Sequence, residues 1–150
     1  MIREYSMVMP EKVSEAFNGY KVCYDVRETS ESELAELWAS SGREGDMTSD
    51  FAHENRYGYY VVAVKMGQWK YDGVVNAIIR DKYRSDEMEA ITNNMAAVNA
   101  VFMQTLVTDG IVEAIKYLKE SADGDDTAAF KEMQEWRELA KREAKGIFGL

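Results

Sequence analysis

Cysteine is nearly absent from this chain of 150 residues, since Cys23 is the only one. A single thiol cannot form an intrachain disulfide, which is typical of proteins kept in a reducing compartment. The first ten residues, MIREYSMVMP, lack the continuous apolar run of a signal peptide. No segment has the roughly 20 apolar residues needed to cross a membrane. We therefore expect a cytoplasmic protein without a membrane partner.

Basic residues are also in short supply. The chain has 18 Lys and Arg against 27 Asp and Glu, which gives a net charge of −9 and a pI of about 4.7. Nucleic-acid backbones are bound mainly by Lys and Arg, which displace counterions, so we expect no direct binding to nucleic acid. The acidity has two interpretations. It keeps the protein in solution, or it imitates nucleic acid and makes the chain a decoy for a nucleic-acid-binding protein.

Histidine is as scarce as cysteine, because His53 is the only one. The usual His and Cys ligands of zinc cannot be assembled from one of each, and Tyr57 stands where a zincin needs its second histidine. No G-x-S-x-G, G-x-G-x-x-G or G-K-[ST] motif occurs. We predict no catalytic residue, no cofactor and no metal site. The enzymatic alternative is a small hydrolase-like site with His53 as general base beside Asp50 or Glu54.

One acidic segment, ADGDD at 122–126, has some features of a calcium loop. Counted from Asp123, the position that needs glycine is Ala128 and the position that needs glutamate is Gln134. The EF-hand pattern therefore fails, and we expect these acids to cap the helix that follows.

Apolar sequence, by contrast, is sufficient for a core. Of all residues 46% are hydrophobic and 11% aromatic, and only one is proline. A chain of this length needs neither disulfides nor metals to stay folded. We predict a single domain, 1–150, of the α+β class and mostly helical. In it, a small antiparallel sheet from residues 1–71 packs on a helical bundle from residues 72–150.

Strand and helix patterns alternate in the first half. YKVCYDVR at 20–27 and YGYYVVAVKMGQW at 57–69 combine alternation with the β-branched and aromatic residues typical of strands. Between them, Ser30 and Glu33 have the spacing of a capping box, which predicts the start of a helix.

Two further segments of the first half have their own predictions. Residues 43–56 are polar and contain Gly, Asp and Ser, so we expect a loop there. Residues 10–19, PEKVSEAFNG, predict one short helix closed by Asn18 and Gly19.

The second half has helical spacing throughout. Asp72 is placed to cap one helix and Ser85 to cap the next, with acids in the first turn where the helix dipole favours them. Along the second of these helices, apolar residues at spacings of three and four form one stripe. Its members are Met88, Ile91, Met95, Val98 and Phe102. A following helix, IVEAIKYLKES, places Val112, Ile115 and Leu118 on one face.

Methionine is abundant, with nine in the chain. Met side chains adapt readily and suit surfaces that bind partners, so the stripe from Met88 to Phe102 is a candidate interface. Core packing is the other interpretation of the same pattern. An aromatic cluster in residues 57–71 leaves the same two interpretations open, with Tyr59 and Trp69 as the candidate interface residues.

Asn93 and Asn94 interrupt the apolar stripe. A buried amide at such a position sets the register of a helix or the pairing between chains, which makes this pair a candidate polar register site. The other interpretation is an exposed pair, or a pair that forms hydrogen bonds with a neighbouring loop.

Two long segments carry a resemblance. GQWKYDGVVNAIIRDKYRSDEMEAITNN at 67–94 and FKEMQEWRELAKREAK at 130–145 resemble segments of small uncharacterised proteins encoded in phages, prophages and mobile elements of gut bacteria. The resemblance covers most of residues 67–145 and is interrupted by residues 95–121. It implies an accessory or structural role and assigns no catalytic residue. We therefore predict a non-enzymatic interaction module that binds a protein partner or itself, as a homo-oligomer, through an apolar helix face.

Overall fold

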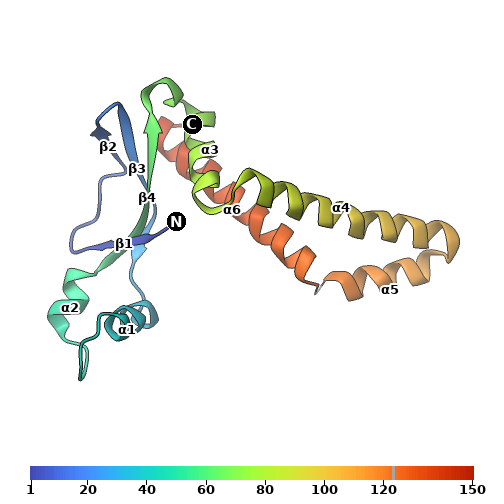
Figure 1. Cartoon of the computed structure of the whole chain (residues 1–150), viewed down its shortest axis with the longest axis horizontal. Helices are drawn as coiled ribbons and strands as arrows, with labels where there is room; N and C mark the ends of the chain where they lie inside the picture. Colours follow the sequence, from blue (N-terminus) through green and yellow to red (C-terminus); the bar gives the residue numbers. More distant parts are fainter. Residues whose placement is uncertain (123) are drawn as a thin grey trace. The chain divides into compact units, whose positions relative to one another are not determined.

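The computed structural model describes residues 1–122 and 124–150 and has the α+β fold that the sequence predicts (Figure 1). The chain forms two compact units. The first contains residues 1–78 and 141–150, and it holds the sheet. The second contains residues 79–140 and consists of helices.

The sheet of the first unit has four antiparallel strands in the order β1-β4-β3-β2. The strands are β1 (Arg3–Ser6), β2 (Val13–Ala16), β3 (Gly19–Glu28) and β4 (Tyr57–Lys65). The two strongest strand patterns are confirmed, because they form the central strands β3 and β4. The second pattern extends further than its strand, since a single turn of 3-10 helix, η1 (Met66–Gln68), follows β4.

The short helix predicted for residues 10–19 is wrong, because β2 occupies that segment and pairs with β3. Ala16 pairs with Gly19, so Phe17 and Asn18 alone make the turn of the hairpin. Asn18 has a φ of 68°, a left-handed conformation that asparagine adopts more easily than most residues. An Asn-Gly pair ends helices and makes hairpin turns equally well, so this signal alone does not separate the two.

The core of the first unit lies on one side of the sheet. Val22 and Tyr24 are 0% exposed and Val64 is 2% exposed, and the three share a face because of the alternation along paired strands. The ring of Tyr24 stacks on that of its cross-strand partner Tyr60, with centroids 5.5 Å apart. Buried aromatic and β-branched pairs of this kind are the main stabilising contacts of a sheet.

Two helices follow the sheet's long strand. The capping box of α1 (Glu31–Ser40) is confirmed, since Ser30 accepts from the backbone of Glu33 and Glu33 accepts from the backbone of Ser30. The loop predicted for residues 43–56 is wrong in part, because Ser49–Glu54 form α2. Thr48 caps α2, and the buried Phe51 holds it by edge contact with the Trp38 ring at 5.0 Å. Phe51 is the one buried residue of α2, and a single buried residue does not give the periodic apolar pattern that predicts a helix.

The helix predicted after Asp72 is α3 (Tyr71–Lys82), and Asp72 lies in its first turn instead of capping it. Val74 and Ile78 on its apolar face are fully buried in the first unit. Gly73 makes a close backbone approach, because an added Cβ would lie 1.8 Å from the carbonyl oxygen of Gln68.

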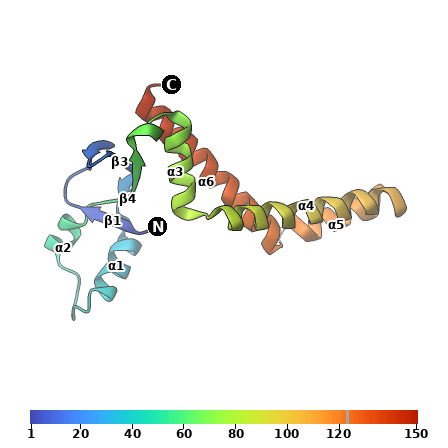
Figure 2. The same cartoon turned by 45° about the horizontal axis from the view of Figure 1, so that its top comes forward.

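In the second unit, α4 (Ser85–Thr108) and α5 (Ile111–Ala122) run side by side as a hairpin (Figures 1 and 2). The last helix is α6 (Asp125–Phe148), and its Met133 and Ala140 are buried. Ser85 begins α4 but does not cap it. Arg84 occupies the cap position, and its backbone N–H donates to the Glu87 carboxylate at 2.8 Å.

Candidate interaction surface

The α4–α5 hairpin turns at Asp109 and Gly110. Asp109 ends α4, and Gly110 has a φ of 88°, which a glycine adopts without strain. α5 packs against α4. Ala114 is 0% exposed and is the one buried residue of α5, so it marks the side of α5 that faces α4. A small side chain there lets the two helices approach closely.

The apolar residues of α5 lie on another side of the helix and are exposed. The sequence correctly places Val112, Ile115 and Leu118 on one face, but α4 does not cover that face. Val101 (44%) and Met103 (55%) of α4 are exposed as well, but we give the name outer face to the exposed apolar residues next to the turn and along α5. Its members, with their exposed fractions, are Val107 (80%), Ile111 (64%), Val112 (73%), Ile115 (44%) and Leu118 (44%). The sequence pattern places Val112, Ile115 and Leu118 on one face but does not select them as an interface, and it does not single out Val107 of α4 or Ile111.

Charged residues border the outer face on one side. Val112 and Ile115 line a shallow hollow of about 450 Å³ together with Lys116, Lys119 and Glu120. All five side chains are exposed. The hollow is thus lined by apolar and charged side chains together, and the lysines stand beside Val112.

The stripe of α4 that the sequence selects is half-buried at every position. Its residues are Met88, Ile91, Met95, Val98 and Phe102. Of all 24 residues of α4, which the structure describes completely, none is fully buried. The stripe is therefore covered only in part by the chain itself.

The aromatic candidates of the first unit differ in their surroundings. The Trp69 ring lies 4.1 Å from that of Tyr20 and 5.4 Å from that of Phe148, between centroids, so Trp69 is part of an internal stack. Tyr59 is half-buried on β4 and pairs with Glu4 of the edge strand β1.

Asn93 and Asn94 are both exposed on α4. The side-chain amide of Asn94 donates to the Asp126 carboxylate at 3.0 Å, which connects α4 to the first turn of α6. This arrangement matches the second interpretation of the pair, an exposed amide bonded to a neighbouring segment, although the partner belongs to a helix rather than a loop.

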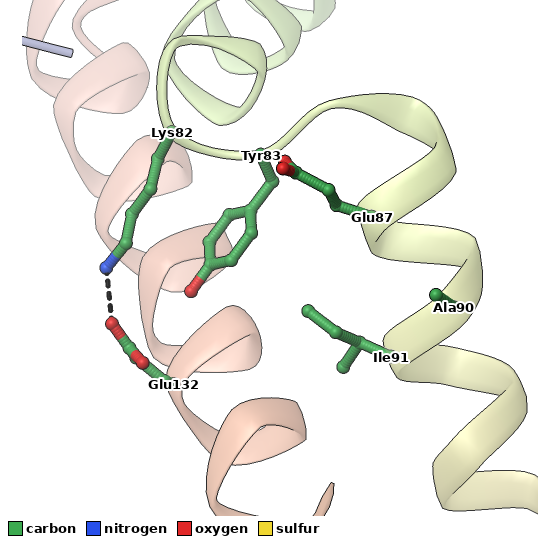
Figure 3. A pocket seen from close by; sticks show the side chains of 6 residues that line it. All are labelled: Lys82, Tyr83, Glu87, Ala90, Ile91 and Glu132. Carbon is green, nitrogen blue, oxygen red and sulfur yellow. Dashed lines mark hydrogen bonds and ion pairs between the residues drawn. The ribbon is translucent and has the colours of Figure 1, made fainter.

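A recess of about 490 Å³ lies where the end of α3, α4 and α6 meet within the second unit (Figure 3). Lys82 Nζ forms an ion pair with Glu132 Oε1 at 2.6 Å and stands 4.6 Å from the centroid of the Trp136 ring. In Figure 3 the Tyr83 ring lies between Lys82 and Ile91. The lysine and the glutamate therefore satisfy each other.

Electrostatics in this recess follow from the same pair. Burial is the largest single cause and lowers the pKa of Lys82, but the hydrogen bonds and charges of Glu132 and Tyr83 together outweigh it, so the pKa is raised overall and the side chain stays charged. Burial is also the largest cause that raises the pKa of the Tyr83 hydroxyl. Neither shift activates a group for acid–base catalysis near neutral pH, because both favour the protonated form.

His53 lies near the end of α2 and is exposed, as are Asp50 and Glu54 of the same short helix. Open water surrounds such side chains, and a general base works best in a shielded cavity. Among residues 1–122 and 124–150, no group of three or more His, Cys, Asp or Glu side chains is arranged to hold a metal ion. Asp123, from which the calcium-loop pattern was counted, lies outside the described residues.

Arg3 forms a polar cluster that the sequence patterns did not reveal. Its Nη1 lies 3.1 Å from Asp25 Oδ2, its Nε lies 3.3 Å from Glu33 Oε1, and its guanidinium stands 5.0 Å from the centroid of the Tyr60 ring. The Arg3 side chain is only 10% exposed. These contacts tie the edge strand β1 to β3, β4 and α1, so the cluster has a structural role.

Cys23 is half-buried on β3. Burial is the largest cause that raises the pKa of its thiol, and the nearby Glu4 carboxylate adds to it. A thiol with a raised pKa is a poor nucleophile at neutral pH.

No helix among the described residues is both long and apolar enough to cross a membrane. Comparison of the chain with protein-family models, with curated proteins and with solved structures found no match.

Proposed function

We propose that this protein is a non-enzymatic association module that binds a second copy of itself through the outer face of the α4–α5 hairpin. The observation that carries the proposal is the exposure of five large aliphatic side chains, 44% to 80% each, on one hairpin. Each buried side chain of this kind contributes about 1.5–3 kcal/mol relative to an exposed one. Covering the outer face therefore supplies a strong driving force for association.

The size of the outer face fits a second copy. If each of the five side chains exposes on the order of 100 Å², two copies joined here bury about 1,000 Å², the lower bound for a specific interface. Apolar side chains at the same positions of two copies are complementary to each other, which is the condition for a two-fold contact. Lys116, Lys119 and Glu120 stand beside Val112 and Ile115, and the long lysine side chains can extend past the apolar contact to water.

The resemblance to phage and mobile-element proteins agrees with this function. The resemblance implies an accessory or structural role, and self-association requires no reaction centre. The same proposal accounts for the placement of ionisable groups, because the charges of the Lys82 recess are paired and His53 is in open water.

Two differently tagged copies of the chain test the proposal. Copies mixed at micromolar concentration should co-purify, and Ile115→Glu in both copies should abolish this. An unpaired carboxylate buried at the interface costs several kcal/mol, so the dissociation constant should rise by at least about a hundredfold.

A matched control keeps the charge change but moves it away from the outer face. Glu113 lines a different groove, together with Thr105 and Asp109, so Glu113→Lys should leave co-purification unchanged. Circular dichroism should show the same helix content in both variants, because both residues are exposed. Tagged copies that never co-purify, or an Ile115→Glu variant that associates like the wild type, would overturn the proposal.

A further inference from the structure

We infer that two copies join with their α5 helices parallel, around a two-fold axis that runs along these helices, so that the two hairpin tips meet at the same end. This inference rests on the proposed self-association and specifies its geometry. The tip is the turn at Asp109 and Gly110 with the residues next to it. An antiparallel pair, with the tips at opposite ends, is the alternative arrangement.

The first argument is the spacing of the outer face. Ile111, Ile115 and Leu118 follow one another at intervals of four and three. This is the spacing of the apolar seam in a coiled coil, where identical positions of two parallel helices meet in register. A parallel pair therefore places Ile111 on Ile111, Ile115 on Ile115 and Leu118 on Leu118, and it covers all three seam positions.

The second argument is the position of Val112. Val112 is two positions before Ala114, which is about 200° around a helix, so Val112 lies opposite the side that faces α4. In the parallel pair, a two-fold axis parallel to the α5 helices relates the two copies. The flank of α5 that carries Val112 in one copy then lies next to α4 of the other copy. In the antiparallel pair, both α4 helices lie on one side and both Val112 flanks remain open. Only the parallel pair covers Val112, which is 73% exposed in the single chain.

Exposure along the hairpin gives a third argument. Ile115 and Leu118 are each 44% exposed, whereas Val107, Ile111 and Val112, nearest the turn, are 64% to 80% exposed. The parallel pair brings these most exposed side chains of both copies together at one end. The antiparallel pair would place each tip beside the far end of the other α5, beyond Leu118.

The lysines agree with the same arrangement. Lys116 and Lys119 lie on the flank of α5 that contains Val112. A two-fold axis along the helices puts the lysines of the two copies on opposite sides of the pair. The antiparallel arrangement puts all four on the same side, where like charges repel.

Disulfide cross-linking tests the geometry on the full-length chain. In a Cys23→Ser background, single cysteines replace Ile111, Ile115 or Leu118, and each variant is oxidised at micromolar concentration. Each of the three should form a disulfide-linked dimer by itself. Glu113→Cys, away from the outer face, should form roughly tenfold less, because a disulfide needs Cβ atoms within about 4.5 Å.

The outcomes separate the geometry from the proposed function. If, of the three single variants, Ile115→Cys alone cross-links by itself, and Ile111→Cys links with Leu118→Cys only when the two are mixed, the pair is antiparallel. That result overturns the geometry and leaves self-association intact. If the Cys23→Ser chain is a monomer by light scattering and no variant links faster than Glu113→Cys, both the geometry and the proposed function are overturned.

Discussion

The sheet of the first unit and the α4–α5 hairpin of the second differ in how far the chain itself covers their apolar residues. In the sheet unit, Val22 and Tyr24 are 0% exposed and are covered by the same chain. In the hairpin, α4 has no fully buried residue, and Val107 and Val112 are 80% and 73% exposed. Hydrophobic burial drives both folding and association. The buried core of the sheet stabilises the first unit itself, whereas the exposed side chains of the hairpin are the ones that we propose a second copy covers.

The largest expected effect tests the first half of this comparison. Tyr24→Ala removes a fully buried ring that stacks on Tyr60, so it should lower the free energy of unfolding of the sheet unit by about 3–5 kcal/mol. Urea unfolding followed by Trp fluorescence measures this loss. A loss below about 1 kcal/mol would mean that the sheet unit is not the well-packed part of the protein.

A second prediction concerns backbone packing in the sheet unit. Gly73→Ala places a Cβ 1.8 Å from the carbonyl oxygen of Gln68, so the backbone must shift. We expect a loss of about 1–3 kcal/mol in the free energy of unfolding. Gly67→Ala is the matched control, because a Cβ there has no atom within 4 Å. Equal effects of the two substitutions would contradict the close approach.

The capping box of α1 should have a smaller effect that depends on pH. Ser30→Ala removes the cap and should cost about 1 kcal/mol at neutral pH. The backbone N–H of Ser30, which donates to the carboxylate of Glu33, is the largest cause that lowers the pKa of Glu33 below its usual 4.5.

The sign of the pH effect follows from that shift. Because the folded state prefers the charged form, the contribution of Glu33 is complete above a pH of about 4.5 and is lost as the pH falls through its lower folded value. The stability difference between wild type and Glu33→Gln should therefore shrink in acid. A difference that stays constant from neutral pH to below the folded pKa would contradict this role of Glu33.

The smallest expected effect tests the other half of the comparison. Leu118→Ser removes an apolar side chain that is 44% exposed in the single chain. At concentrations low enough to keep the protein monomeric, its free energy of unfolding should change by less than about 1 kcal/mol. At high concentration, the same variant should lose stability relative to wild type, because association stabilises the folded state. A large loss at both concentrations would show that Leu118 belongs to an internal core.

Much of the fold could be predicted from local patterns. The capping box at Ser30 and the two central strands are encoded by residues close together in sequence, and those predictions are confirmed. The edge strand β2 was mistaken for a helix, because its partner strand rather than its own pattern determines its conformation. The short helix α2 depends on the contact of Phe51 with Trp38, which no local spacing indicates.

The position of the candidate surface was harder to predict from the sequence than the fold. Helical spacing shows which residues share a face, as it does for Ile115 and Leu118, but it does not show which face a neighbouring helix covers. Ala114 decides this in α5, since the small residue and not the large ones is buried. The sequence therefore predicted an apolar helix face as an interface but selected the half-buried stripe of α4.

The molecular mass of the wild-type chain in solution, measured by sedimentation equilibrium over a range of concentrations, tests the central claim most directly. The account predicts a mass that rises from one chain of 17.1 kDa toward two at micromolar concentration, and an Ile115→Glu variant that stays at one. A wild-type chain that remains a single copy across this range would contradict it.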